Sequence, residues 1–89
     1  MLRFPVVLTQ AQALQTAREL KAQVATQADG VVLDASALTQ FDSSALSVML
    51  ACRREAMAAG KTFIVQGMPP KLSQLAGLYG VGQLISSSV

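Results

Sequence analysis

The sequence predicts a small α/β domain in which three helices pack against a mainly parallel β-sheet. Three segments with helical periodicity alternate with short apolar runs, in the order β-α-β-α-β-α, and the connections between them are short. Such alternation implies right-handed crossovers between parallel strands. The 89 residues are expected to form one domain over residues 1–89, and a mean hydropathy of +0.44 excludes a disordered chain.

Residues 2–8 are expected to form the first strand. Pro5 has no backbone N–H to donate to a ladder, so this strand suits the edge of a sheet or a bulge. The first helix follows a capping-box sequence, in which Thr9 and Gln12 can each bond the other's backbone N–H. It is expected to run to about Thr26, with an apolar stripe formed by Leu14, Ala17, Leu20 and Val24.

The second strand follows a turn signal, Asp29-Gly30. Residues 31–33 are a continuous run of Val and Leu. A strand that is apolar on both faces is typical of a sheet covered by helices on both sides. Asp34 is expected to end the strand, and residues 35–40 are expected to form a loop.

The second helix is expected to run from about Asp42 to Ala59. Gly60 is well placed as the left-handed residue just past its end, because glycine adopts positive φ without steric cost. The β-branched and aromatic run Thr62–Val65 then predicts the third strand.

The third helix is expected to begin at the prolines of the connector, residues 67–70. Gly80 stops it. Residues 81–85 are expected to form a short final strand or turn, and residues 86–89 are expected to fray. The apolar positions of this helix, at helical spacing, are Leu72, Leu75, Ala76 and Tyr79.

The sequence offers little material for catalysis, so no enzyme activity, metal or cofactor is expected. It has no histidine, the commonest general base and metal ligand. Its acidic residues are scattered, whereas a metal site needs clustered ligands. The only cysteine, Cys52, falls on the inner arc of the second helix and is expected to be a buried core thiol.

Charge and hydropathy also limit the partners. A net charge of +2 without a basic stripe argues against nucleic acid. No apolar run approaches the roughly 20 residues of a membrane span, and no signal peptide is evident at the start of the chain. We therefore expect no direct membrane insertion and a cytoplasmic location, with which a single cysteine is compatible.

The unusual local feature is Asp42-Ser43-Ser44, three small polar residues at the mouth of an apolar helix. The simplest interpretation is capping, in which the Asp42 carboxylate accepts from the backbone N–H of Ser44 or Ala45. The functional interpretation is a docking site. A phosphate on Ser43 would add about −1.5 to −2 charges there, which the helix start tolerates but a partner pressed against it would not.

The second helix has a broader apolar arc than one sheet-facing stripe requires. Leu46, Leu50 and Met57 extend that arc to one side, next to Arg53 and Arg54. Either the third helix buries them, or some of them form an exposed patch with an arginine rim, as at many protein interfaces. The candidate docking residues are thus Asp42, Ser43, Ser44, Leu46, Leu50, Arg53 and Arg54.

Three segments give the chain a resemblance to the STAS family: residues 33–36 (Leu-Asp-Ala-Ser), residues 41–46 (Phe-Asp-Ser-Ser-Ala-Leu) and Gly60-Lys61 before a strand. In the anti-anti-sigma factors of that family, a partner serine kinase phosphorylates the serine that follows the aspartate. The resemblance places that position at Ser43. It implies a STAS-like α/β fold without catalysis, and an anti-sigma factor kinase as one partner.

The tail points to a subfamily. Residues 65–68 (Val-Gln-Gly-Met) and 75–81 (Leu-Ala-Gly-Leu-Tyr-Gly-Val) resemble the STAS subunit of the Mla system. That resemblance implies an accessory subunit that activates or stabilises the cytoplasmic ATPase of a phospholipid-transporting ABC system. It would sit at the inner face of the inner membrane through the transporter complex. The anti-anti-sigma factor remains the alternative.

The chain departs from the family in two ways. The family opens with a β-hairpin, for which residues 2–8 leave no room, and an uncovered edge favours self-association, although Pro5 opposes it. Ala45 stands where the anti-anti-sigma pattern has glycine.

Overall fold

The computed structural model describes residues 1–82 and Ser87–Ser88. The final strand expected over residues 81–85 lies mostly outside the described residues, whereas Ser87 and Ser88, expected to fray, form a short strand. The elements are β1 (Leu2–Arg3), β2 (Val7–Leu8), α1 (Gln10–Val24), β3 (Gly30–Asp34), β4 (Gln40–Phe41), α2 (Ser44–Ala58), β5 (Thr62–Gln66), α3 (Pro70–Leu78) and β6 (Ser87–Ser88).

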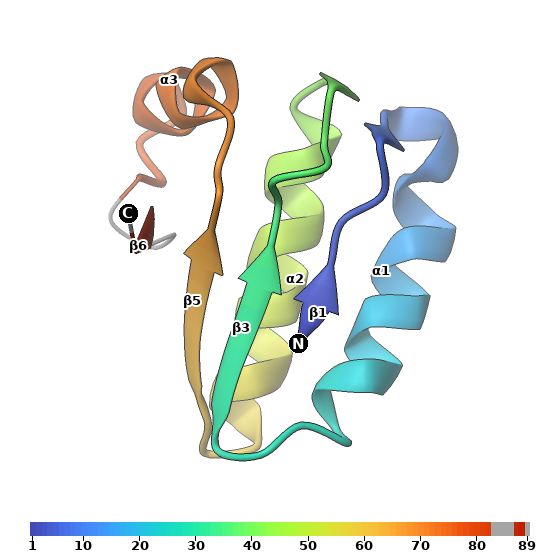
Figure 1. Ribbon diagram of the computed structural model, residues 1–89, viewed down its shortest axis with the longest axis vertical. Helices are drawn as coiled ribbons and strands as arrows, with labels where there is room; N and C mark the ends of the chain where they lie inside the picture. The colour runs from blue at the N-terminus through green and yellow to red at the C-terminus, as the bar shows by residue number, and fades with distance from the viewer. Residues whose placement is uncertain (83–86, 89) are drawn as a thin grey trace.

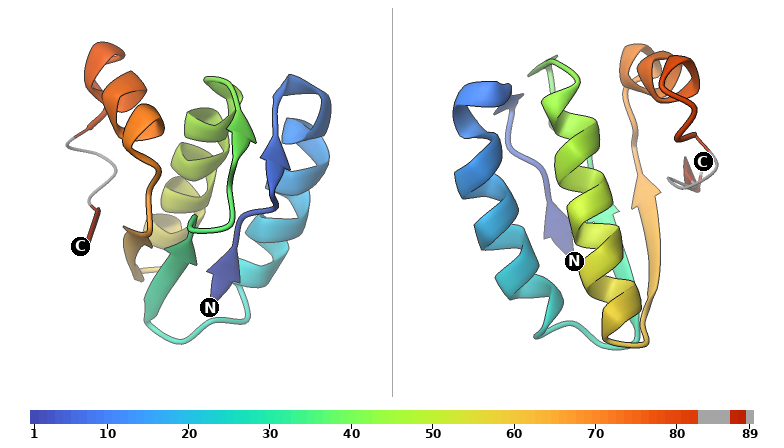
Figure 2. Two further views of the ribbon diagram at one scale, coloured as in Figure 1. Left: turned by 45° about the horizontal axis from the view of Figure 1, so that its top comes forward. Right: turned by 180° about the vertical axis from the view of Figure 1, so that it is seen from behind.

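The main sheet has the strand order β1-β3-β5-β6, and every pair in it is parallel. Helices α1 and α2 pack against each other on one face of this sheet (Figure 1; Figure 2, right), while α3 lies at its upper end, where β5 leads into it. The predicted α/β class with parallel strands and three helices is confirmed.

The first strand was predicted as one segment, and that is wrong. Residues 2–8 divide at Pro5 into β1, which pairs with β3, and β2, which pairs with β4 in a separate two-stranded sheet. Pro5 cannot donate to the ladder, so the chain leaves the main sheet there. The supposed loop 35–40 correspondingly ends in β4, and the N–H of Thr39 donates to the carbonyl of Val6 (2.9 Å).

The core lies between the main sheet and the two long helices. Alternate strand residues point into it, whereas their neighbours lie on the other face. Its fully buried side chains include Leu2, Val31, Leu33 and Val65 from the sheet, Val24 from α1, and Met49, Cys52 and Ala56 from α2.

Helix α1 meets the core along a stripe that begins at Ala13 and not at Leu14. Leu14 is 65% exposed, and the half-buried Ala13 and Ala17 lead instead to the buried Leu20 and Val24. In a helix this rich in alanine, a one-residue change of phase costs little apolar burial. The predicted stripe is therefore wrong at Leu14 and correct for its other members.

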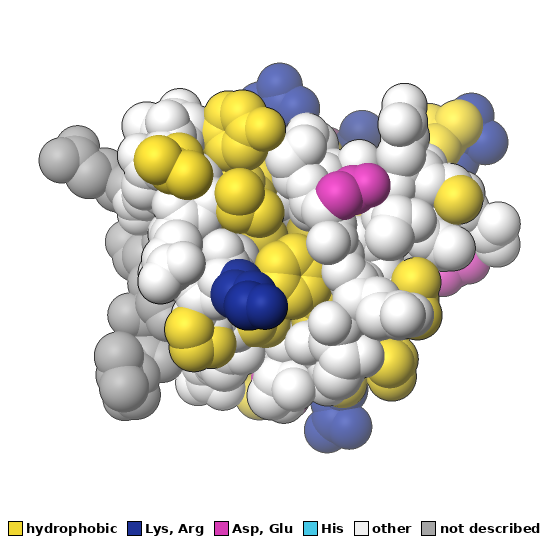
Figure 3. All heavy atoms as spheres, turned by 90° about the horizontal axis from the view of Figure 1, so that it is seen from above, with side chains coloured by type: hydrophobic (Ala, Val, Ile, Leu, Met, Phe, Trp, Pro, Cys, Tyr) yellow, Lys and Arg dark blue, Asp and Glu magenta, His cyan; other side chains and the backbone are white. Residues whose placement is uncertain are grey.

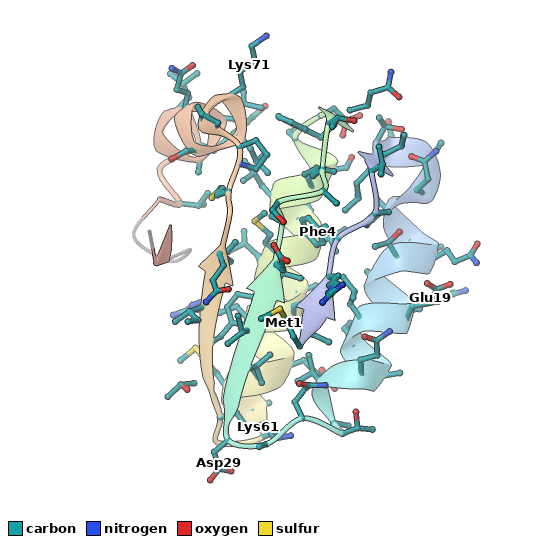
Figure 4. The ribbon with its side chains drawn as sticks, viewed as in Figure 1. Met1, Phe4, Glu19, Asp29, Lys61 and Lys71 are labelled. Atoms are coloured by element: carbon teal, nitrogen blue, oxygen red, sulfur yellow. The ribbon has the colours of Figure 1, made fainter. Side chains whose placement is uncertain are left out.

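In the part of the chain that the structure describes, helices cover only one face of the main sheet, contrary to the expectation from residues 31–33. Val32 and Ile64 are only half-buried, and they pair in register on the face away from α1 and α2. Figure 4 shows the side chain of Met1 on this near side of the sheet. The continuous apolar run of β3 thus places Val31 and Leu33 in the core and Val32 on the opposite face of the sheet.

At the lower end of the molecule, a lysine side chain donates hydrogen bonds to backbone carbonyls at the end of α1. The ammonium of Lys61 donates to the carbonyl of Val24 (2.8 Å), the last residue of α1, and to that of Gln27 (2.7 Å), just after the helix. Gly60, at φ 73°, ends α2 as predicted and directs Lys61 there, near Asp29 (Figure 4). A lysine at the C-terminal end of a helix satisfies carbonyls that the helix leaves unpaired.

Candidate functional site

The start of α2 is held by Asp42, as the capping interpretation predicts. The N–H of Ser44 donates to Asp42 Oδ1 (2.8 Å). The N–H of Gln10, the first residue of α1, donates to Asp42 Oδ2 (3.1 Å). One carboxylate therefore caps two helices and fixes the start of α2 relative to that of α1.

These bonds also set the charge of the site. The backbone N–H of Ser44, then its hydroxyl, and more weakly the N–H of Gln10 lower the pKa of Asp42 below its ordinary value of 3.8. Donors to the ionised form stabilise that form. Asp42 is therefore a carboxylate at neutral pH, and both its oxygens are occupied within the chain.

The two serines that follow Asp42 have different surroundings. Ser44 is half-buried and turned toward Asp42, whereas Ser43 is exposed in the first helical turn. Ser43 is thus the hydroxyl that a partner or a modifying enzyme can reach. The hydroxyl of Ser44 bonds to Asp42 and so takes part in the cap.

A groove of about 280 Å³ runs between α2 and the end of α3. A second hollow, of about 300 Å³, continues it along α2. Ser47 and Leu50 line both of them. We call the two together the docking groove; it is lined by Ser43, Leu46, Ser47, Leu50, Arg53, Arg54, Tyr79 and Val81.

The docking groove brings together five of the seven predicted site residues, namely Ser43, Leu46, Leu50, Arg53 and Arg54. Asp42 and Ser44 instead form the cap at the start of α2. Sequence reasoning missed Ser47, although it stands four residues after Ser43 and so on the same helix face. It also grouped Tyr79 with the apolar positions of the third helix, whereas Tyr79 is 61% exposed at the end of α3.

The broad apolar arc of α2 is partly buried and partly exposed, so each of the two predicted alternatives holds for some of its residues. Leu46 is 4% exposed, so it forms the floor of the groove. Leu50 is half-buried in its wall, and Met57 is 54% exposed near the other end of α2. The guanidinium groups of Arg53 and Arg54 line the part of the groove farther along α2 from Ser43. An apolar floor with a polar and basic rim is the usual composition of a protein-binding surface.

The end of α3 is positioned by two glycines. Gly67, at φ 66°, lies so close to Ser36 that an added Cβ would stand 2.7 Å from the Ser36 Cβ. It lets the chain pass the end of β3 before α3 begins. Gly80, at φ 71°, then ends α3 and returns the chain, so that the N–H of Val81 donates to the carbonyl of Ala76 (2.9 Å) beside the groove.

Figure 3 looks down on this upper end of the molecule. Hydrophobic side chains gather in a band across its centre, with one Lys or Arg over the band and an Asp or Glu beside it. The half-buried Leu75 and the exposed Leu78 and Tyr79 belong to the α3 side of this end. Lys71 projects from the top of α3 (Figure 4).

Cys52 faces the core, as predicted. Its side chain is fully buried, and burial raises the pKa of the thiol to about 11. A thiol of that pKa is protonated at neutral pH and is a poor nucleophile. Across the part of the chain that the structure describes, no helix is both long and apolar enough to cross a membrane.

Comparison with known proteins identifies a family and a similar fold. A family model described as "Mlab, STAS domain" matches residues 6–86. The solved structure of the anti-sigma factor antagonist SpoIIAA in its unphosphorylated form is similar over 98% of this chain and 76% of that chain, with a TM-score of 0.74 and 17% sequence identity. Among curated proteins no match was found.

Proposed function

Since the chain belongs to the STAS family, we propose that it is a non-enzymatic binding module of the MlaB type. It docks on the cytoplasmic ATPase of a phospholipid-transporting ABC system and activates or stabilises that ATPase. The match of residues 6–86 to the MlaB-type model supports this choice of partner. On this proposal the protein is cytoplasmic and reaches the inner face of the inner membrane through the transporter complex.

The observation that carries the proposal is the docking groove beside Ser43. Its leucine floor offers apolar area, which is the main source of affinity at a protein interface. The hydroxyls of Ser43 and Ser47 and the two arginines supply directional contacts at its edge. The site is held rigidly, because Asp42 ties α2 to α1 and Gly80 returns the chain to the groove after α3.

Co-purification with the ATPase tests this proposal. Leu50→Asp places a charge in the half-buried wall of the groove, and we expect loss of the complex and of the stimulated ATP turnover. Leu14→Asp is the matched control, because Leu14 is 65% exposed on α1, away from the groove. If both variants bind the ATPase like the unaltered protein, the docking groove is not the interface.

A second candidate function is that of an anti-anti-sigma factor, whose partner is an anti-sigma factor serine kinase. The exposed hydroxyl of Ser43 and the structural similarity to SpoIIAA favour it. Incubation with a cognate kinase and ATP is then expected to add the mass of one phosphate. Ser43→Ala removes that gain and Ser47→Ala, one turn away in the same groove, retains it. An active kinase that adds no mass contradicts this candidate.

A further inference from the structure

Within residues 1–82 and Ser87–Ser88, the topology leaves one face of the main sheet without a helix over it. The strand order β1-β3-β5-β6 advances in one direction only. Right-handed crossovers between strands that always advance the same way place every connecting helix on the same side. Both long helices accordingly lie behind the sheet in Figure 1 and in front of it in the reverse view of Figure 2.

The residues of this uncovered face follow from the strand register. We call it the open sheet face. Val32 and Ile64 are in-register neighbours and form its apolar row. Arg3, Asp34 and Gln66 form the row above it, because Arg3 pairs with Asp34 and Asp34 with Gln66. Parallel sheets are almost always covered on both faces, so two β-branched side chains that are only half-buried on such a sheet indicate room for a further layer.

We propose that the open sheet face is a self-association surface whose occupant is a second copy of this chain. Arg3 on β1 and Asp34 on β3 place a cation next to an anion on neighbouring strands of this face. A two-fold axis parallel to the strands and midway between β1 and β3 sets Arg3 of each copy opposite Asp34 of the other. Such a face is complementary to itself, as a two-fold interface requires.

The distances and charges involved allow this pairing. Sheets that pack face to face lie about 10 Å apart, which an arginine and an aspartate side chain span together. A net charge of +2 gives little repulsion between two copies. The neighbouring Val32 becomes buried near the axis, which adds an apolar contribution to the two ion pairs.

The size of the face sets the strength of the dimer. Its two long strands, β3 and β5, have five residues each, and β1 has two. A face formed by so few strand residues buries well below the roughly 800 Å² per partner of a standard interface. The dimer is therefore weak and forms with rising concentration. Its surface lies on the opposite layer from α2, so both docking grooves stay open and the proposed function does not depend on it.

Sedimentation velocity of the purified protein between about 10 μM and about 1 mM covers the range expected of so small an interface. We expect the sedimentation coefficient of the unaltered protein to rise over that range. Arg3→Glu sets like charges opposite each other and is expected to weaken the dimer at least about tenfold. Arg54→Glu makes the same change of charge on the exposed face of α2 and is expected to leave the dimer intact.

A mixing experiment tests the reciprocal pairing itself. Arg3→Glu and Asp34→Arg each set like charges across the two-fold axis, but a mixture of the two variants sets opposite charges at both positions and is expected to form a heterodimer. Asp34 also accepts from the N–H of Ser36 (2.9 Å), so the fold of its variant is checked by circular dichroism. A protein that stays monomeric at the highest concentration, or a dimer that Arg3→Glu and Arg54→Glu affect equally, overturns the proposal.

Discussion

The two ends of this molecule differ in whether their polar and apolar groups are bonded and packed within the chain or left exposed at the surface. At the lower end, Lys61 donates to carbonyls at and just after the end of α1, and an added Cβ at Gly60, which ends α2, would meet nothing within 4 Å. At the upper end, Ser43 and Tyr79 stay exposed beside a groove with an apolar floor. The lower end is completed by the chain itself, whereas the upper end is rigid but leaves surface for a partner. Substitutions at the two ends are therefore expected to separate stability from binding.

The largest expected effect comes from Gly67, compared with Gly60, which also has a positive φ. Alanine at φ near +70° costs about 1–2 kcal/mol. At Gly67 the added Cβ also meets Ser36 at 2.7 Å, whereas at Gly60 nothing lies within 4 Å. We expect Gly67→Ala to lower the free energy of unfolding by at least about 1 kcal/mol more than Gly60→Ala does, because overpacking adds to the backbone strain. Urea denaturation measures both, and equal losses contradict the close approach to Ser36.

The second-largest loss of stability is expected from substitution of Lys61. Lys61→Met keeps most of the apolar stem but removes the ammonium, leaving the carbonyls of Val24 and Gln27 without this donor. We expect a loss of about 1–3 kcal/mol in the free energy of unfolding. Affinity for the ATPase should be unchanged, because Lys61 lies at the far end from the docking groove. If the variant is as stable as the unaltered protein, the hydrogen bonds of the Lys61 ammonium do not contribute to the free energy of unfolding.

The smallest effect is expected at Asp42 and depends on pH. Folding lowers the pKa of this carboxyl, so its contribution to stability is complete above the ordinary value of 3.8 and is lost as pH falls through the lowered pKa. Asparagine has one carbonyl oxygen, so Asp42→Asn can cap either α1 or α2 but not both. The variant is expected to lose stability near neutral pH and to show a flatter decline below pH 4 in thermal unfolding. An unchanged acid profile contradicts the double cap.

The sequence predicted the fold through its long, strongly patterned elements. The region over β3, α2 and β5 was placed to within a few residues, because caps and apolar runs act locally. The split at Pro5 was missed, since strands as short as β2 and β4 are too brief to show a period of two. The uncovered face of β3 was missed because Val31 and Val32 are identical in type, and only tertiary packing distinguishes them.

The candidate site was also predictable only where local sequence patterns determine it. Residues on one face of α2 follow from helical spacing, so Ser43, Leu50 and Arg54 could be grouped from the sequence. Tyr79 could not be assigned, because its side of the groove depends on how α3 ends and where its last turn lies in space. The capping role of Asp42 on α2 was local and predictable, but its bond to α1 joins residues 32 positions apart.

The central claim is that the docking groove, and not another surface, meets the ATPase. Hydrogen–deuterium exchange on the complex of the full chain with the ATPase tests it most directly. Slower exchange is predicted in residues 43–54 and around Tyr79 and Val81, with no change around Lys61 or in β3. Protection concentrated at Lys61 or on the open sheet face, with the groove exchanging as in the free protein, would contradict the account.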